Sequence, residues 1–295
     1  MKIGIVGLGN MGLGMGVTLH RKHHQVSGFD LSAAARTAAE AAGLNVQADL
    51  ASLLAGSDVI ILSLPKAQHV EAVCLGDGGI QALGHAGQIV IDTTTSTAAV
   101  SQTVHQVLAS QGITFIDAPV SGGPSGAASG SMTMVVGASD ADYQRILPLL
   151  ADMSAVQVHV GECGAGNIVK IGNNLLAAAH LITTAEAVSM AAKAGVAPEK
   201  FLAGINKGSG RSAVSEVSFP KWVLNQAFDS GFTMGLMRKD VGLAQDLIQA
   251  QAQTLPLSHL VGQLWQQSVA TLADQEDFNA IVQDTDPLLF VKATS

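Results

Sequence analysis

Cysteine and positive charge are both scarce in this chain of 295 residues. The two cysteines, Cys74 and Cys163, lie far apart and neither forms a CxxC pair, so neither a disulfide framework nor a zinc site is supported. A reducing, cytoplasmic location is therefore expected. Lysine and arginine number 15 against 23 acidic residues, which gives a net charge of -8. Because proteins that bind phosphate backbones need basic surface, we expect no nucleic-acid partner.

Aromatic residues and long apolar runs are also few. Phe, Trp and Tyr make up 4% of the residues. The most apolar run of the longest helical stretch, residues 175–182, is interrupted by His180 and is shorter than the about 18 residues that a membrane span needs. Lys2 precedes an apolar stretch, but its glycines and the lack of a small-residue cleavage site argue against a signal peptide. We expect no membrane partner.

Glycine and apolar side chains are in excess. Glycine accounts for 32 of the 295 residues, where roughly 7% is usual, and this indicates tight turns and close backbone approaches. Apolar residues make up 48%, which suffices for a buried core and argues against disorder. With about 150 residues per domain as a guide, the length predicts two domains or one large one.

Short apolar runs alternate with amphipathic segments in the first half of the chain. The runs that predict strands are residues 2–6, 25–30, 58–64, 88–92, 113–117, 132–137 and 156–160. The segments that predict helices are residues 11–22, 31–42, 97–110 and 140–153. This alternation predicts an α/β fold with a parallel, doubly wound sheet of the Rossmann type, covered by helices on both faces.

The strand pattern stops after Gly164. Residues 167–194 predict one helix of roughly 42 Å, too long to end inside one layer. Further helices are expected over residues 198–206, 212–224, 234–252 and 256–273. We therefore predict a Rossmann-type domain over residues 1–163 and an all-α domain over residues 164–295, joined by the long helix.

A glycine motif follows the first predicted strand. Residues 7–12 fit GxGxxG and open a helix, where free N–H groups and a partial positive charge suit a pyrophosphate. Asp30 ends the second predicted strand, where a carboxylate accepts hydrogen bonds from the adenosine ribose and repels a 2′-phosphate. The pattern predicts NAD in preference to NADP, although GxGxxG in a chain this rich in glycine also fits a plain tight turn.

Two further strand ends are expected in the same crevice, Leu64-Pro65 and residues 93–96, because ligands of open α/β sheets bind beyond the carboxyl ends of the strands. The alternative for residues 93–96 is an N-cap of the next helix. Residues 121–123, Ser-Gly-Gly, expose successive N–H groups that suit a carboxylate, or else form a plain strand-to-helix turn.

Lys170 is the one charged residue between Gly164 and Ala185. It lies four residues before Asn174, so both project from one side of the long helix. An isolated lysine on an apolar helix usually extends to solvent. At a domain boundary, however, partial burial lowers a lysine pKa toward the range of proton exchange.

Four motifs, in order along the chain, together resemble the β-hydroxyacid dehydrogenases. They are residues 7–12 with Asp30, residues 117–130 (DAPVSGGPSGAASG), residues 164–174 (GAGNIVKIGNN) and residues 239–244 (KDVGLA). The family includes 3-hydroxyisobutyrate dehydrogenase, tartronate semialdehyde reductase and serine- and threonate-oxidising relatives, and the resemblance spans essentially the whole chain.

The resemblance implies a role for each matching residue. Lys170 matches the catalytic lysine, a general acid/base on the hydroxyl or carbonyl oxygen. Substrate-binding roles are implied for Ser121, Gly122, Gly123, Asn174 and Lys239. Motif and resemblance together predict cofactor contacts at Gly7, Gly9, Asn10, Met11, Gly12, Asp30, Leu64, Pro65, Thr95 and Lys239. The segment around Thr95 departs from the Ser-Thr-Ile-x-Pro of many members, and the role of Arg211 stays open.

These predictions describe an NAD-dependent oxidoreductase of a small 3-hydroxy acid similar to 3-hydroxyisobutyrate, serine or threonate, with no metal. The alternatives are an NADPH-dependent reductase of a small aldehyde acid, such as tartronate or succinic semialdehyde, on the same scaffold, and a non-catalytic NAD-binding protein. The apolar second domain and the resemblance predict a homodimer or homotetramer.

Overall fold

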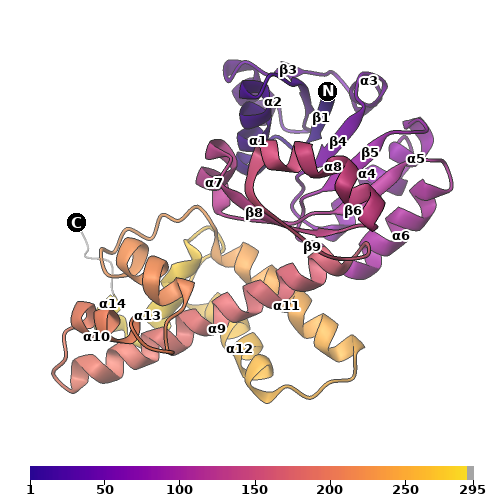
Figure 1. The fold of residues 1–295 in the computed structure, drawn as a ribbon. Coiled ribbons are helices and arrows are strands. Elements are labelled where there is room, and N and C mark those ends of the chain that lie inside the picture. Colours follow the sequence, from indigo (N-terminus) through magenta and orange to yellow (C-terminus); the bar gives the residue numbers. More distant parts are fainter. Residues whose placement is uncertain (291–295) are drawn as a thin grey trace. The chain divides into compact units, whose positions relative to one another are not determined.

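The computed structural model describes residues 1–290 and contains two compact units, one over Met1–Lys170 and one that begins at Ile171 (Figure 1). The first unit is built on a nine-stranded sheet in the order β3-β2-β1-β4-β5-β6-β8-β7, with β9 paired to β8. Its strands are β1 (Lys2–Val6), β2 (Gln25–Phe29), β3 (Asn45–Val46), β4 (Val59–Leu62), β5 (Ile89–Asp92), β6 (Thr114–Asp117), β7 (Val120–Ser121), β8 (Met132–Gly137) and β9 (Ser154–Gly161).

The sheet is mixed, and the prediction of a purely parallel sheet is wrong at β8. Strands β1 to β6 pair in parallel, whereas β8 runs antiparallel to β6 and β7. The chain continues past β6 as an extended segment and returns through the short helix α7 (Gly123–Ser129), so β8 pairs with Ser121 at Thr133 and with Asp117 at Gly137. This hairpin-like return needs no crossover helix.

Helices cover both faces of the sheet (Figure 1). Those of the first unit are α1 (Asn10–Arg21), α2 (Ala33–Ala41), α3 (Leu50–Ala55), α4 (Ala67–Leu75), α5 (Ile80–Leu83), α6 (Ala98–Ala109), α7 and α8 (Asp140–Met153). One apolar cluster contains Met15 of α1, Ala127 of α7 and Leu150 of α8, and a second contains Leu53 of α3 and Val104 of α6. The strands are buried between these two clusters, which explains their continuous apolar runs.

The second unit is helical. Helix α9 (Ala165–Lys193) begins in the first unit and continues into the second. It is followed by α10 (Pro198–Ile205), a π-helix over Val214–Val223, α11 (Met234–Ala250), α12 (Pro256–Gln267), 3₁₀ turns over Ser268–Ala270 and Phe278–Ile281, α13 (Val282–Thr285) and α14 (Pro287–Phe290). Its core includes Trp265, Phe219 and Phe290. The predicted fold class, a Rossmann-type sheet followed by a helical part with a long helix, is confirmed.

Helix α9 has the length and composition of a membrane span, with a mean hydropathy of 1.4 in its most apolar window. The uninterrupted apolar run over residues 175–182 is shorter than a membrane span, whereas hydropathy averaged over a longer window of α9 tolerates His180. Of that window, 44% is buried inside the chain. The core helix of a soluble protein passes the same test.

Candidate active site

The first and third glycines of the GxGxxG motif are required by packing. Gly7 adopts a φ of 94°, and a Cβ at this residue would lie 2.2 Å from the Ser63 carbonyl oxygen. A Cβ at Gly12 would lie 1.9 Å from the Gly7 carbonyl oxygen. These two glycines therefore let the β1–α1 turn close tightly against β4.

The second glycine, Gly9, faces open space. A Cβ built there meets nothing within 4 Å, and Gly9 is the N-cap of α1 without a side-chain cap. Asn10 and Met11 follow as the first residues of the helix. Because the first N–H groups of a helix have no partner within it, this end of α1 suits a pyrophosphate. The open space beside Gly9 and the uncapped helix fit a dinucleotide cofactor.

Asp30 follows β2 and holds the glycine-rich turn in place. Its Oδ2 accepts a hydrogen bond from the Leu8 N–H at 2.7 Å, and its Oδ1 accepts one from the Ser32 N–H at 2.7 Å. The Arg36 guanidinium donates to the Asp30 carbonyl oxygen at 2.7 Å. The predicted ribose-binding carboxylate thus lies beside the predicted pyrophosphate-binding turn, and each of its oxygens has a further lone pair for a ribose hydroxyl.

The ends of β4 and β5 are tied together next to this turn. The Leu64 N–H donates to Thr94 Oγ1 at 3.0 Å, and Thr93 Oγ1 donates to the Leu62 carbonyl oxygen at 2.7 Å. Pro65 and Thr95 lie on the same two connections. The alternative that residues 93–96 are an N-cap is wrong, because Thr97 caps α6 by accepting from the Val100 N–H.

Lys170 lies on α9 within hydrogen-bond reach of the predicted carboxylate-binding turn. Its Nζ donates to Ser121 Oγ at 3.0 Å, and the residue is 8% exposed. Gly122 and Gly123 follow with φ of 125° and 63°, a backbone that favours glycine. The alternative of a solvent-extended lysine is therefore wrong, and the structure brings Lys170, Ser121, Gly122 and Gly123 together.

The other predicted substrate residues lie in the second unit. Asn174 Nδ2 donates to Asp240 Oδ2 at 2.5 Å, and Lys239 Nζ lies 3.0 Å from Asp240 Oδ1. Both Asn174 and Asp240 are buried. One carboxylate thus orients both predicted substrate residues. Sequence reasoning assigned no role to Asp240, although its place directly after Lys239 was a usable signal.

Asp117 is a second carboxylate that sequence reasoning left without a role. It is fully buried at the end of β6, and its two oxygens accept from the backbone N–H groups of Gly164 and Asn167. Burial raises the pKa of this carboxyl, and the two hydrogen bonds oppose that rise.

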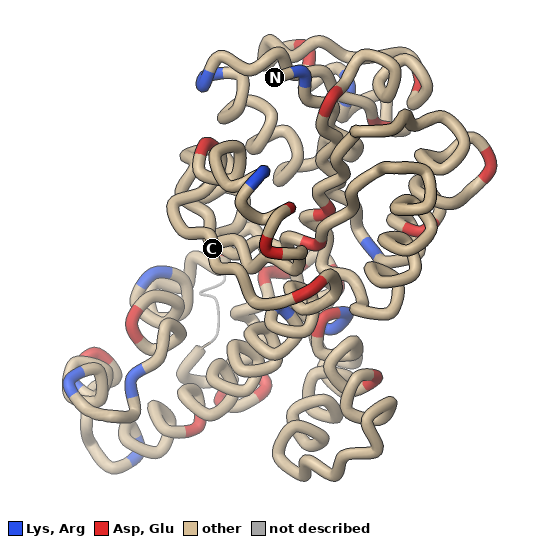
Figure 2. Tube along the Cα trace, turned by 45° about the vertical axis from the view of Figure 1, so that its right-hand side comes forward, with Lys and Arg blue, Asp and Glu red and all other residues tan. Residues whose placement is uncertain are grey.

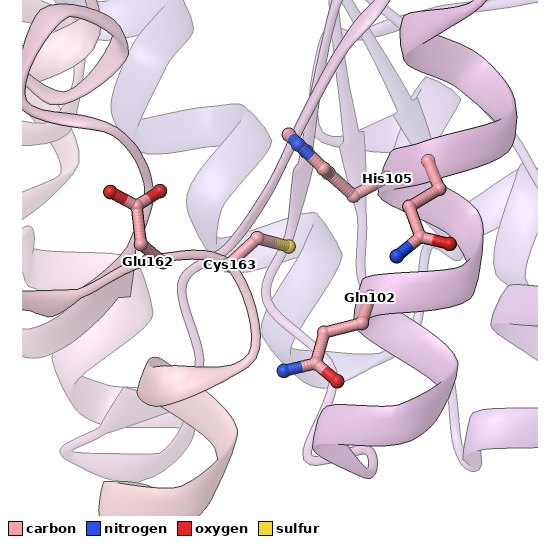
Figure 3. A pocket seen from close by; sticks show the side chains of 5 residues that line it. Gln102, His105, Glu162 and Cys163 are labelled. Carbon is pink, nitrogen blue, oxygen red and sulfur yellow. The ribbon is translucent and has the colours of Figure 1, made fainter.

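A small polar pocket of about 240 Å³ lies beside the start of α9, lined by Gln102, His105, Gln106, Glu162 and Cys163 (Figure 3). Cys163 turns its sulfur toward α6, and Glu162 turns its carboxylate away. Burial and the nearby Asp117 carboxylate raise the pKa of the Cys163 thiol, which disfavours the reactive thiolate.

Charged residues of both signs are interspersed along the trace (Figure 2). Among residues 1–290, no group of three or more His, Cys, Asp and Glu side chains could hold a metal ion. The candidate site therefore combines an anion-binding helix end, a carboxylate beside it and a buried lysine on a serine hydroxyl. That set can bind a dinucleotide and move a proton.

Two family descriptions match the chain. One is the NAD-binding domain of 6-phosphogluconate dehydrogenase, over residues 2–164, and the other is the NAD-binding region of NADP-dependent 3-hydroxyisobutyrate dehydrogenase, over residues 164–284. Together they account for nearly the whole chain.

Relatives match over nearly their full length. The 2-(hydroxymethyl)glutarate dehydrogenase of Eubacterium barkeri is 36% identical over 96% of this chain and 94% of its own. The NAD-dependent L-serine dehydrogenase of Pseudomonas aeruginosa is 32% identical over 97% and 98%. The solved structure of Mycobacterium tuberculosis 3-hydroxyisobutyrate dehydrogenase with L-serine has a TM-score of 0.89 at 31% identity, and the match covers 97% of this chain and 99% of that one.

Proposed function

This chain belongs to the β-hydroxyacid dehydrogenase family, and on that premise we propose that it transfers a hydride between NAD and a small 3-hydroxy acid with Lys170 as general acid/base. The chain is an NAD-binding oxidoreductase of the hydroxy-acid type. The observation that carries the finer proposal is the 3.0 Å hydrogen bond from Lys170 Nζ to Ser121 Oγ, which holds the lysine at the turn over residues 121–123.

The chemistry of each residue type assigns its role in the reaction. Bound NAD supplies the hydride acceptor. In oxidation, neutral Lys170 takes the proton of the substrate hydroxyl, and in reduction its ammonium form protonates the developing alkoxide. Because an ammonium has three donors, Lys170 can keep Ser121 Oγ as a partner while it offers another N–H to the substrate oxygen. The N–H groups around Gly122 and Gly123 bind the substrate carboxylate.

A substrate panel tests this proposal. 3-Hydroxyisobutyrate, L-serine, glycerate and threonate are each assayed with NAD and with NADP, and tartronate and succinic semialdehydes are assayed with NADH and NADPH. We expect turnover of at least one 3-hydroxy acid with NAD. Turnover of the semialdehydes with NADPH alone would replace the proposal with the reductase alternative, and no turnover of any compound would overturn it.

Asp30→Asn is expected to raise the NADP-to-NAD ratio of kcat/KM by at least about tenfold, because it removes a negative charge that repels a 2′-phosphate. The asparagine oxygen can still accept from the Leu8 N–H, so the turn is retained. Asp49→Asn, a change of the same kind at the N-cap of α3, serves as the control and should leave the ratio unchanged. If the NADP-to-NAD ratio of kcat/KM is unchanged in Asp30→Asn, Asp30 does not contact the adenosine ribose.

A homodimer or homotetramer built through the helical part is a further element of this proposal, together with a cytoplasmic location. Large apolar side chains lie exposed on α9 and α12, among them Leu176, Met190, Leu257 and Leu260. Exposed apolar surface of this kind favours association. Sedimentation that shows only a species near 30.1 kDa would contradict it. Both cysteines are free and buried, which agrees with a reducing compartment.

A further inference from the structure

The carboxylate of Asp117 fastens the start of α9 to the end of β6. Its Oδ1 accepts from the Gly164 N–H at 2.6 Å and its Oδ2 from the Asn167 N–H at 2.7 Å. Both N–H groups belong to the beginning of the helix, where backbone donors otherwise lack partners. The capping group thus comes from a strand about 50 residues earlier in the chain, rather than from the residue before the helix.

The same joint is closed by glycine packing. A Cβ at Gly137 would lie 2.2 Å from Asp117 Oδ1, and a Cβ at Gly166 would lie 2.7 Å from the Val135 carbonyl oxygen and 2.9 Å from Asp117 Oδ2. Any side chain at either position would push the helix away from the carboxylate. The side chain of Asn167 adds a third tie, since its Oδ1 accepts from the Ser96 N–H at 2.8 Å.

The strand segment that carries Asp117 also carries Ser121, the partner of Lys170. Asp117 and Ser121 are four positions apart in the sequence, and both are held in register against β8, at Gly137 and Thr133. Helix α9 is therefore attached to this one segment twice, by Asp117 at its first turn and through Lys170 at Ser121. A displacement of the first turn of α9 would therefore also displace Lys170 relative to Ser121.

The Asp117 cap differs from the Asp49 cap of α3, because the Asp117 carboxylate is buried away from water. Asp49 caps α3 from an exposed position, and its pKa is lowered by the Ser52 hydrogen bonds. Asp117, in contrast, is 0% exposed, and burial raises its pKa. The two hydrogen bonds from the helix to a buried carboxylate fix the position of the first turn of α9. Any displacement of the helix would break at least one of them and leave a buried polar group without a hydrogen-bond partner.

We propose that Asp117 is a positioning residue for the reaction, which fixes the distance between Lys170 and the substrate turn over residues 121–123 by anchoring the first turn of α9. This inference rests on the proposed function of Lys170. It assigns Asp117 no contact with substrate or cofactor.

Two variants test it by opposite means. Asp117→Asn removes the charge and leaves one of the two N–H groups facing an amide, whereas Gly137→Ala keeps the carboxylate and inserts a methyl group into the joint. We expect each to lower kcat by about 10- to 100-fold, since a misplacement of about 1 Å has effects of that size. The KM for NAD should stay within about twofold, because the β1–α1 turn is untouched.

Two changes of the same kind provide controls. Asp49→Asn removes an N-cap charge at α3, and Gly204→Ala adds a Cβ where nothing lies within 4 Å. Both should keep the wild-type kcat. The rate of Cys163 alkylation reports whether the joint has opened. Peptide analysis distinguishes Cys163 from the fully buried Cys74, which serves as the internal reference. We expect Cys163 to be alkylated faster in Gly137→Ala than in wild type.

The outcomes separate the two proposals. A purely structural Asp117 would lower the melting temperature in both variants and leave kcat of the folded enzyme unchanged, and that result would overturn the inference. A fall in kcat matched by an equal rise in the KM for NAD would overturn it too. Wild-type enzyme that turns over none of the hydroxy acids would instead overturn the proposed function, and the inference with it.

Discussion

Lys170→Met is expected to lower kcat by about 10²- to 10⁴-fold, the usual contribution of a positioned general acid or base. The change removes the Nζ that lies 3.0 Å from Ser121 Oγ and keeps most of the side-chain volume. The NAD affinity, measured by fluorescence titration, should stay nearly that of wild type, because the β1–α1 turn and Asp30 form their own hydrogen bonds. Steady-state kinetics over pH 6 to 10 provide the measurement.

Lys170→Arg distinguishes proton transfer from charge alone. A guanidinium can still donate to Ser121 but cannot release its proton, since its pKa exceeds about 12. If Lys170 is the acid/base, this variant should be nearly as impaired as Lys170→Met. Lys193→Ala, a change on the exposed end of the same helix, is the control and should keep wild-type kcat. Wild-type turnover in Lys170→Met would remove the lysine from the mechanism.

Gly9→Ala is expected to leave the fold intact and to weaken NAD binding by about 10- to 100-fold. The added Cβ meets no atom of the chain within 4 Å, so melting should be close to wild type. The same methyl group stands where a pyrophosphate approaches the backbone, and overpacking costs about 1–3 kcal/mol. Thermal unfolding with and without NAD, together with titration of NAD, gives both quantities.

Gly12→Ala provides the opposite pattern. Its Cβ would lie 1.9 Å from the Gly7 carbonyl oxygen, so α1 must shift away from β1 and the free energy of unfolding should fall by about 3 kcal/mol or more. A Gly9→Ala variant that binds NAD as wild type does would place the pyrophosphate away from this turn. A Gly12→Ala variant with unchanged stability would contradict the packing described for the turn.

Secondary-structure elements with strong local patterns could be predicted from the amino-acid sequence. The strand over Lys2–Val6 and the turn after it were predictable, because apolar periodicity and a GxGxxG spacing are local signals. The same holds for α9, whose predicted residues 167–194 agree with Ala165–Lys193 to within two residues. The short helices α3, α4, α5 and α7 were missed, since segments of four to nine residues carry little periodicity.

The family resemblance, the dinucleotide motif and the position of Lys170 could be recognised in the amino-acid sequence, because each rests on short motifs that follow one another in order along the chain. Three features depended on the folded chain: β8 turns back antiparallel, Asp117 accepts from the Gly164 N–H 47 residues away, and Asp240 accepts from Asn174 Nδ2. These features arise from pairings between distant segments. A buried carboxylate finds its N–H or amide partner through the packing of strands and helices, which no local spacing specifies.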